Sequence, residues 1–284
     1  MRLIHSATMQ AWSAGFKAMN LRCEICGRSM TLRHFSDHKA GIRMHGRWYC
    51  SSSCFASAVE KELSALRTWG PDPANRVERM PLGLMLVSQG LLTSSEFQDV
   101  MGEQKESGGE IGELLVRRGS VSEKQVTAVR ATQWGCPVFS AAQYQVQSKI
   151  NIPSAFMRLY SMIPLHYVNA TNLLLVGFVH NVEYGLLYAI EKMTGCKTEP
   201  CFVTPSDFRI QLQEIEQAKE ENGESTAREL EFESVHSSVE MARILCNYGA
   251  HLEADEAIIE KFKEHLWTRL KCGPKDVDLL FKVG

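Results

Sequence analysis

The chain has 284 residues, a formal net charge of −2 and a pI near 6.5, so it lacks the basic excess typical of a protein devoted to nucleic acid. No apolar run reaches the length of about 18 residues that a membrane span needs, and the start of the chain lacks a signal-peptide core. Nine cysteines, five of them single in apolar surroundings, suit a reducing compartment, so we expect a cytoplasmic protein of two or three small domains.

After an N-terminal tail at 1–20, two cysteine pairs mark the segment 21–67. Cys23 and Cys26 have two residues between them, Cys50 and Cys54 have three, and 23 residues separate the pairs. Four thiolates on two tight turns suit tetrahedral zinc, and a segment this short buries too little apolar surface to fold without a staple. A closed set of four thiolates leaves no open coordination position. We therefore expect structural Zn²⁺ on these four cysteines.

Other interpretations of the cysteines stay open. A pair of disulfides is disfavoured in the cytoplasm, and a thioredoxin-like redox motif would need a βαβ context. His34, His38 or His45 could replace one thiolate. The aromatic residues beside the second pair resemble a treble-clef or TRASH-type finger, in which that pair leads into a helix, here expected at 56–67.

The finger is locally basic, with six cations against two acidic residues between positions 21 and 50. The cations are Arg22, Arg28, Arg33, Lys39, Arg43 and Arg47. This excess could contact phosphate groups, although a finger without a base-reading helix is as often a protein-contact module. A nucleic-acid-binding regulator is therefore the alternative function.

Beyond a linker at 68–78, a 24-residue unit at 81–104 repeats at 110–133, an offset of 29 residues. In each copy a short apolar helix stops at a glycine, a capping box follows (Thr93 with Glu96, Ser122 with Gln125), and a second helix begins. We expect two tandem helical hairpins within 80–135. The repeated positions comprise Leu82, Gly83, Leu86, Val87, Gly90 and Gln104 in the first copy, and Gly112, Leu115, Val116, Gly119 and Gln133 in the second.

The next segment, 150–215, is expected to form a small α/β layer. A helix is expected through residue 160, strands at 162–165 and 172–179, a helix at 181–193, a third strand at 201–203 and a final helix from 204.

These motifs resemble the N-terminal domain of type II secretion and type IV pilus assembly ATPases, in its MshE-like (MshEN) form, over about residues 80–215. The resemblance implies that the paired motifs hold cyclic di-GMP through the eleven repeated positions named above. It also implies a partner from a secretion, pilus or motility machine. The family's leading arginine is Pro81 here in one copy and Glu110 in the other, and a carboxylate repels an anionic ligand. Arg79, Arg117, Arg118 or Arg130 could substitute, so retention and loss of this ligand both stay open.

The chain lacks the sequence features of a nucleotide-hydrolysing enzyme. No Gly-x-x-x-x-Gly-Lys-Ser/Thr loop occurs, and Gly273-Pro274-Lys275 lacks both its spacing and its hydroxyl. No Gly-x-Ser-x-Gly or His-Glu-x-x-His motif occurs either. We expect a non-catalytic adaptor or sensor.

A charged stretch at 216–230 is expected to be a linker, and the tail at 231–284 is expected to be helical. Residues 276–281 could be extended or helical. The fold class expected is therefore α+β and multidomain: a zinc finger, a helical-hairpin repeat with an α/β layer, and a C-terminal helical segment. The two apolar stripes that favour the helical tail are Val235, Val239, Ala242 and Leu245, then Ile258, Phe262, Leu266 and Leu270.

Overall fold

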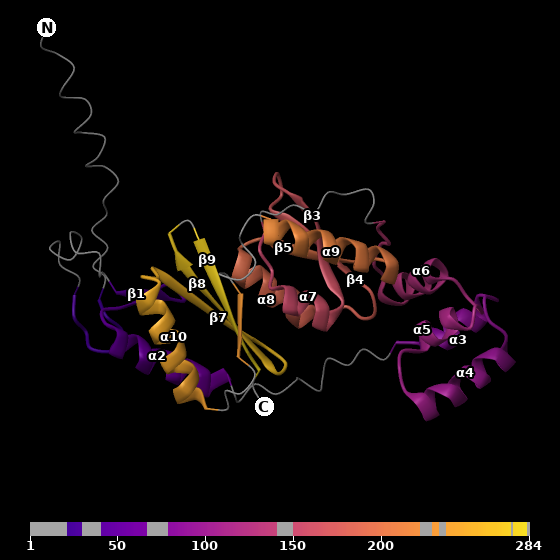
Figure 1. Cartoon of the computed structure of the whole chain (residues 1–284), viewed down its shortest axis with the longest axis horizontal. Helices are drawn as coiled ribbons and strands as arrows, with labels where there is room; N and C mark the ends of the chain where they lie inside the picture. The colour runs from indigo at the N-terminus through magenta and orange to yellow at the C-terminus, as the bar shows by residue number, and fades with distance from the viewer. Residues whose placement is uncertain are drawn as a thin grey trace, which may run out of the picture.

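The computed structural model describes residues 22–29, 41–66, 79–140, 150–221, 229–232, 237–273 and 275–282. The predicted tail 1–20, the linker 68–78, His34, His38 and Val235 lie outside these residues. Figure 1 shows three parts along the long axis: a sheet with two helices, a central α/β layer, and the repeat helices at the far end. Within the described residues, no helix combines the length and the apolar character needed to cross a membrane.

A six-stranded sheet joins the cysteine-rich segment to the C-terminal part of the chain. Its order is β2-β1-β7-β8-β9-β6. β1 pairs antiparallel with β2 and parallel with β7. The strands β7, β8 and β9 form an antiparallel meander, and β6 pairs parallel with β9. The strands are β1 (Ile42–Met44), β2 (Arg47–Tyr49), β6 (Glu229–Phe232), β7 (Glu256–Phe262), β8 (His265–Cys272) and β9 (Lys275–Lys282).

Two helices, α2 (Ser52–Leu66) and α10 (Ser238–His251), cover one face of this sheet. Phe55 and Val59 of α2 and Leu245 of α10 are fully buried in the core that they form with the strands. The finger therefore shares its core with the C-terminal segment. A finger separate from that segment is not what the structure shows.

The prediction of a helical tail at 231–284 holds for α10 and is wrong for the strands, because residues 231–232 belong to β6 and residues 256–282 form β7, β8 and β9. For residues 276–281 the extended alternative is confirmed. Ile258 and Phe262 face the α/β layer, whereas Leu266 and Leu270 face α2 and α10. A spacing of four residues also keeps side chains on one face of a strand, so the stripe did not distinguish the two structures. Lys263 adopts a positive φ of 51° in the hairpin turn, where the expected helix would have continued.

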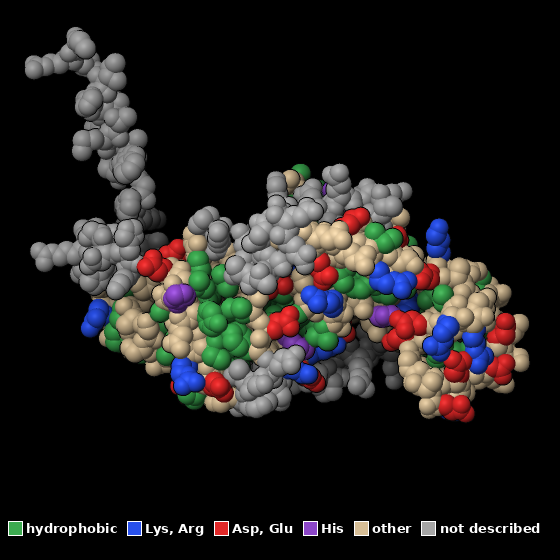
Figure 2. All heavy atoms as spheres, in the orientation of Figure 1, with side chains coloured by type: hydrophobic (Ala, Val, Ile, Leu, Met, Phe, Trp, Pro, Cys, Tyr) green, Lys and Arg blue, Asp and Glu red, His purple; other side chains and the backbone are tan. Residues whose placement is uncertain are grey.

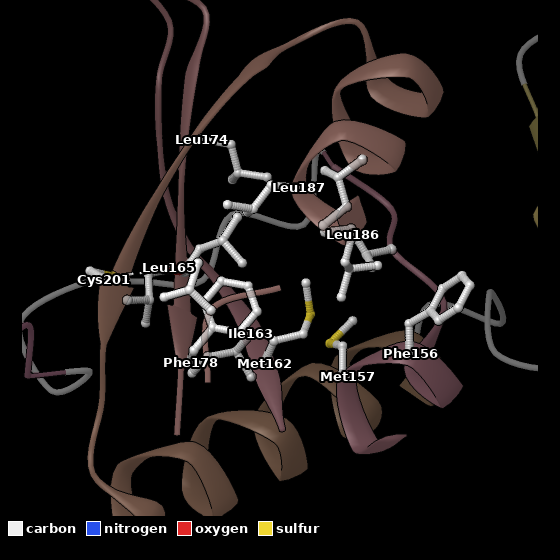
Figure 3. Close-up of a cluster of buried hydrophobic side chains, with 14 of the residues drawn as sticks. Phe156, Met157, Met162, Ile163, Leu165, Leu174, Phe178, Leu186, Leu187 and Cys201 are labelled. Carbon is white, nitrogen blue, oxygen red and sulfur yellow. Dashed lines mark hydrogen bonds between the residues drawn. The ribbon is translucent and has the colours of Figure 1, made fainter. Parts of the chain in front are cut away.

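The central part is a three-stranded sheet, β3-β4-β5, with β3 and β4 antiparallel and β4 and β5 parallel. Figure 3 shows Leu186 and Leu187 of α8 pointing toward Phe178 of β4 and Met162 of β3 across the core. The elements are α7 (Ser154–Tyr160), β3 (Met162–Val168), β4 (Leu173–Phe178), α8 (Tyr184–Thr194), β5 (Lys197–Phe202) and α9 (Pro205–Glu221).

The linker expected at 216–230 is too long at both ends, because regular structure extends into it from each side. Helix α9 continues to Glu221, and Glu229 already belongs to β6. Lys219 explains the helical extension, because its ammonium contacts the carboxylate of Glu229 and donates to Ile152 O and Ser154 Oγ, both at 3.0 Å. Residues 222–228 lie outside the described part of the chain.

Four helices form the repeat: α3 (Leu82–Ser88), α4 (Ser94–Ser107), α5 (Ile111–Arg117) and α6 (Glu123–Trp134). Gln104 at the end of copy 1 donates to Gly109 O just before copy 2, at 3.0 Å. Gln133 at the end of copy 2 donates to Met80 O just before copy 1, at 2.6 Å. These two bonds are equivalent under the 29-residue offset, so the copies clasp each other reciprocally. Figure 2 shows acidic and basic side chains mixed over this end of the molecule, as on a solvated surface.

Candidate functional site

The four predicted metal ligands come together in the structure. Cys23 and Cys26 lie in a turn in which Cys23 N donates to Arg28 O and Gly27 N donates to Cys23 O. Cys50 directly follows β2, and Cys54 lies in the first turn of α2. The four Sγ atoms lie within 4.8 Å of one another.

The spacing of the sulfur atoms suits a tetrahedral metal ion. A Zn–S bond of about 2.3 Å places tetrahedral sulfurs about 3.8 Å apart. Cys26 Sγ lies 3.5 Å from Cys50 Sγ, and Cys50 Sγ lies 3.9 Å from Cys54 Sγ. The cluster could therefore hold a metal ion with little rearrangement.

The pKa values of two thiols in the cluster shift in opposite directions. Burial raises the pKa of Cys23, but hydrogen bonds from the backbone of Cys26, Cys50 and Ile25 outweigh it and lower the pKa to about 6. Burial and hydrogen bonds with the other thiols raise the pKa of Cys50 to about 12. Because metal ligation needs thiolates, metal binding would release protons from the remaining thiols.

The structure does not gather the eleven predicted ligand positions into one site. Leu82, Leu86 and Leu115 are buried in the repeat's own core, and Gln104 and Gln133 make the reciprocal clasp. Val87 packs against that core, Gly90 and Gly119 end α3 and α5 with positive φ values, and Gly83 is covered by Phe97. Gly112 and Val116 line the cavity described next.

This cavity, of about 420 Å³, lies between copy 2 of the repeat and the α/β layer. It opens beside the carboxyl ends of the parallel strands β4 and β5, where ligands bind in open α/β sheets. Sequence reasoning noted Arg117 and Arg130 but missed the residues that the α/β layer contributes. They carry no local motif, because tertiary packing alone brings them to the repeat. The α/β layer supplies Ser161, Val179, His180, Pro205, Phe208 and Arg209; the repeat supplies Gly112, Glu113, Val116, Arg117, Glu123, Val126, Thr127 and Arg130.

Arg130 is the deepest charged group of the cavity, with a side chain only 6% exposed. Its NH2 group donates to Glu110 Oε2 at 3.1 Å, and its NH1 group lies 3.3 Å from His180 Nδ1. Within the described part of the chain, Arg130 Nε is buried without a hydrogen-bond partner. An unpaired buried donor costs free energy, so it is a candidate contact for a ligand.

The charge of His180 follows from its neighbours. Burial, reinforced by the positive charge of Arg130, lowers the pKa of His180 below its usual value. Because a guanidinium can only donate, Nδ1 of the neutral ring accepts from Arg130, and the ring proton lies on Nε2. Nε2 is 3.5 Å from Glu113 Oε1.

The structural parts define an α+β protein with a candidate four-cysteine metal site and a cationic cavity. No family model matches the chain. The type IV pilus assembly ATPase PilB of Thermus thermophilus is 27% identical over 133 residues, which cover 46% of this chain. The same match covers 15% of PilB, so the chain spans well under a fifth of that relative's length. A segment of the chain is therefore similar in sequence to part of a pilus assembly ATPase.

Two solved structures are also similar to this chain. A structure of MshE with cdg is 18% identical, with 48% of this chain and 99% of that chain covered and a TM-score of 0.42. The N-terminal domain of XpsE is 18% identical, with 48% and 97% covered and a TM-score of 0.38.

Proposed function

We propose that this chain is a non-catalytic cytoplasmic adaptor or sensor that docks a protein partner of a secretion, pilus or motility machine. The observation that carries this proposal is the 133-residue similarity to a pilus assembly ATPase. The sequence contains no phosphate-binding loop of the kind that such a motor uses to hold nucleotide. The repeat and the α/β layer thus serve as a docking and sensing unit.

Zinc is the metal proposed for the cysteine cluster, because four thiolates in tetrahedral spacing are its usual structural ligands. Bound zinc would supply a rigid tie between two turns and no chemistry of its own. Cys23 and Cys26 would anchor the turn before β1, and Cys50 and Cys54 the passage from β2 into α2. The role of the metal is therefore to hold the finger in register with the C-terminal sheet.

Cyclic di-GMP is the ligand implied by the family resemblance of the repeat. Glu110 and Arg130, which pair across copy 2, place both a carboxylate and a cation beside the motif. A calorimetric titration of the purified chain decides whether this ligand is sensed. Saturable heat supports a second-messenger sensor. If no heat is measured, the adaptor role remains and the sensing of cyclic di-GMP is rejected.

The adaptor role is tested by immobilising the metal-loaded full chain and capturing proteins from a lysate at high salt. We expect a component of a secretion, pilus or motility machine to be retained, and retention to survive nuclease treatment. The matched variant is Leu84→Glu, which gives the half-exposed Leu84 of α3 the residue that copy 2 carries at Glu113. Capture that disappears with nuclease would reject protein docking.

The alternative function is nucleic-acid binding through the finger. Arg22, Arg28, Arg43 and Arg47 are all exposed in its described part. Changing Arg43 and Arg47 to Glu should then abolish a salt-dependent affinity for DNA. The control with the same charge change, Arg158→Glu with Arg209→Glu, lies outside the finger. Equal DNA affinity in both double variants would reject this alternative.

A further inference from the structure

The two copies of the repeat present different surfaces at equivalent positions. In copy 1 the ring of Phe97 lies over Gly83, and a Cβ added to Gly83 would overlap the ring carbons Cε2 and Cδ2. In copy 2 the equivalent residue is Val126, whose Cγ1 would lie 2.9 Å from a Cβ added to Gly112. Arg130 NH2 would lie 3.0 Å from the same Cβ, and Gly112, Val126 and Arg130 all line the cavity described above. This cavity is lined by copy 2 of the pseudo-symmetric repeat and by no residue of copy 1.

The copies also differ in charge at this place. Arg130 in copy 2 is equivalent to Met101 in copy 1 under the 29-residue offset. Of the three guanidinium nitrogens, NH1 and NH2 already donate to His180 and Glu110, and Nε is buried without a partner within the described residues. Arg130 Nε is therefore the buried, charge-assisted donor that the cavity can offer to an anion.

Charged side chains of both signs line the cavity. The three cations Arg117, Arg130 and Arg209 face the two carboxylates Glu113 and Glu123. Glu123 is engaged at the start of α9, where it accepts from Ser206 N at 3.2 Å and lies 3.5 Å from Arg209. Glu103 and Glu110, which lie outside the lining, pair with Arg117 at 2.8 Å and with Arg130 at 3.1 Å. Each cation therefore already has a carboxylate partner, and an anionic ligand would share these cations with the carboxylates.

The apolar side chains that line the cavity suit a flat, apolar part of a ligand. Val116 and Val126 come from the repeat, and Val179, Pro205 and Phe208 come from the α/β layer. A volume of about 420 Å³ falls in the range of small-molecule sites, and the ring of Phe208 offers a surface for stacking.

We propose that this cavity binds a small monoanion, with one negative group carried on one aromatic ring system, and that Arg130 Nε donates to the negative group. This proposal deepens the sensing role proposed above and rests on it. A two-fold cyclic dinucleotide fits poorly, because the equivalent place in copy 1 is filled by Phe97 and has Met101 in place of a cation. The negative group can be a phosphodiester or a carboxylate.

The test is calorimetry on the metal-loaded full chain with three probes. Cyclic GMP carries one base and one phosphodiester, indole-3-carboxylate carries one ring system and one carboxylate, and cyclic di-GMP carries two bases and two phosphodiesters. We expect at least one of the first two to bind saturably and more tightly than cyclic di-GMP. Which of the two binds identifies the anionic group.

Two variants transplant residues of copy 1 into copy 2. Arg130→Met removes the donor, and Val126→Phe fills the cavity while Arg130 stays in place. Each variant should lower the affinity for the probe by at least about tenfold, which is the effect of losing one charged hydrogen bond. Arg158→Met, on α7 outside the cavity, should leave the affinity unchanged. Val126→Phe keeps the test decisive if Arg130→Met fails to fold.

Three results would overturn the proposal: no binding of either single-charge probe, cyclic di-GMP binding as tightly as they do, or full affinity in both cavity variants. Partner capture by the wild-type chain is measured on the same preparation. Partner capture without probe binding rejects the ligand proposed for the cavity and leaves the adaptor role standing. Probe binding without any captured partner rejects the adaptor role and leaves the cavity proposal standing.

Discussion

Arg269 of β8 and Asp278 of β9 form the most deeply buried ion pair described in the structure, with side chains 4% and 1% exposed. Arg269 Nε and NH2 donate to the two carboxylate oxygens at 2.8 and 2.9 Å. Arg269 NH1 donates to Met193 O, NH2 also donates to Asn151 O, and Trp267 Nε1 donates to Asp278. The network therefore connects the six-stranded sheet to the end of α8.

Replacing Asp278 by Asn should destabilise the chain strongly, because the Arg269 charge would stay buried without its counter-ion. Breaking a buried pair on one side costs about 3–5 kcal/mol. Denaturant unfolding measures the loss, and Glu256→Gln serves as the control. Glu256 pairs with Lys271 at 2.9 Å on the partly exposed part of the same sheet, where such pairs contribute about 0–1 kcal/mol. Equal losses in the two variants would contradict a specific role for the buried network.

Two glycines of the repeat should respond to alanine with opposite signs. In Gly83→Ala the new methyl group meets the ring of Phe97, and overpacking of this kind costs about 1–3 kcal/mol. Gly102, within α4, has no atom near its added Cβ, so Gly102→Ala should stabilise the helix by about 0.5–1 kcal/mol. Thermal unfolding of both variants gives the comparison. Stabilisation by Gly83→Ala would show that Phe97 moves aside without cost.

At the scale of elements, the capping boxes of α4 and α6 differ in one informative way. Thr93 N donates to Glu96 Oε2 at 2.9 Å, whereas Ser122 N donates to Gln125 Oε1 at 2.8 Å. Hydrogen bonds from the side chain and then the backbone of Thr93 lower the pKa of Glu96. Because the folded pKa is lowered, this contribution is present above the unfolded pKa and is lost as the pH falls through the folded value.

Glu96→Gln should therefore reduce stability at neutral pH and have no effect once Glu96 is protonated in acid. Removing the cap hydroxyl by Thr93→Ala or Ser122→Ala should cost about 1 kcal/mol in each helix. Only the Thr93 effect should shrink in acid, since Gln125 does not titrate. Unfolding measured across this pH range separates the two caps. A Ser122→Ala effect with the same pH dependence would assign the titration to another group.

The caps could be predicted from sequence because Thr93–Glu96 and Ser122–Gln125 lie within one turn, and the structure confirms both. The even spacing of Ile258, Phe262, Leu266 and Leu270 favoured a helix although it fits a strand equally. Their assignment depends on partners distant in sequence, as when Ile258 pairs with Arg269 across the hairpin. The cysteine cluster could be predicted because metal ligands recur at short spacings. The cationic cavity could not, because His180 and Phe208 reach it only through folding.

For the whole molecule, the main consequence is that the finger and the C-terminal segment form one folded unit. β1 pairs with β7 through Arg43 with Glu256 and Met44 with Ala257, residues more than two hundred positions apart. α2 and α10 pack together over the sheet, and a Cβ added to Gly249 would lie 3.1 Å from Ile42. The repeat, by contrast, has its own core of Leu86, Val100 and other apolar residues.

Removing the metal should therefore loosen the C-terminal sheet as well as the finger. Hydrogen exchange after chelation should show faster exchange in α2, in β7 and in α10, by at least about tenfold, which corresponds to about 1.4 kcal/mol. Cys50→Ser should reproduce this pattern without chelator, because it removes one of the four thiolate ligands. Amides of α3 to α6 are the internal control, since their core is separate. Unchanged protection in α10 after metal loss would mean that the sheet holds its shape through packing alone, and that the cysteine cluster stabilises only its own two turns.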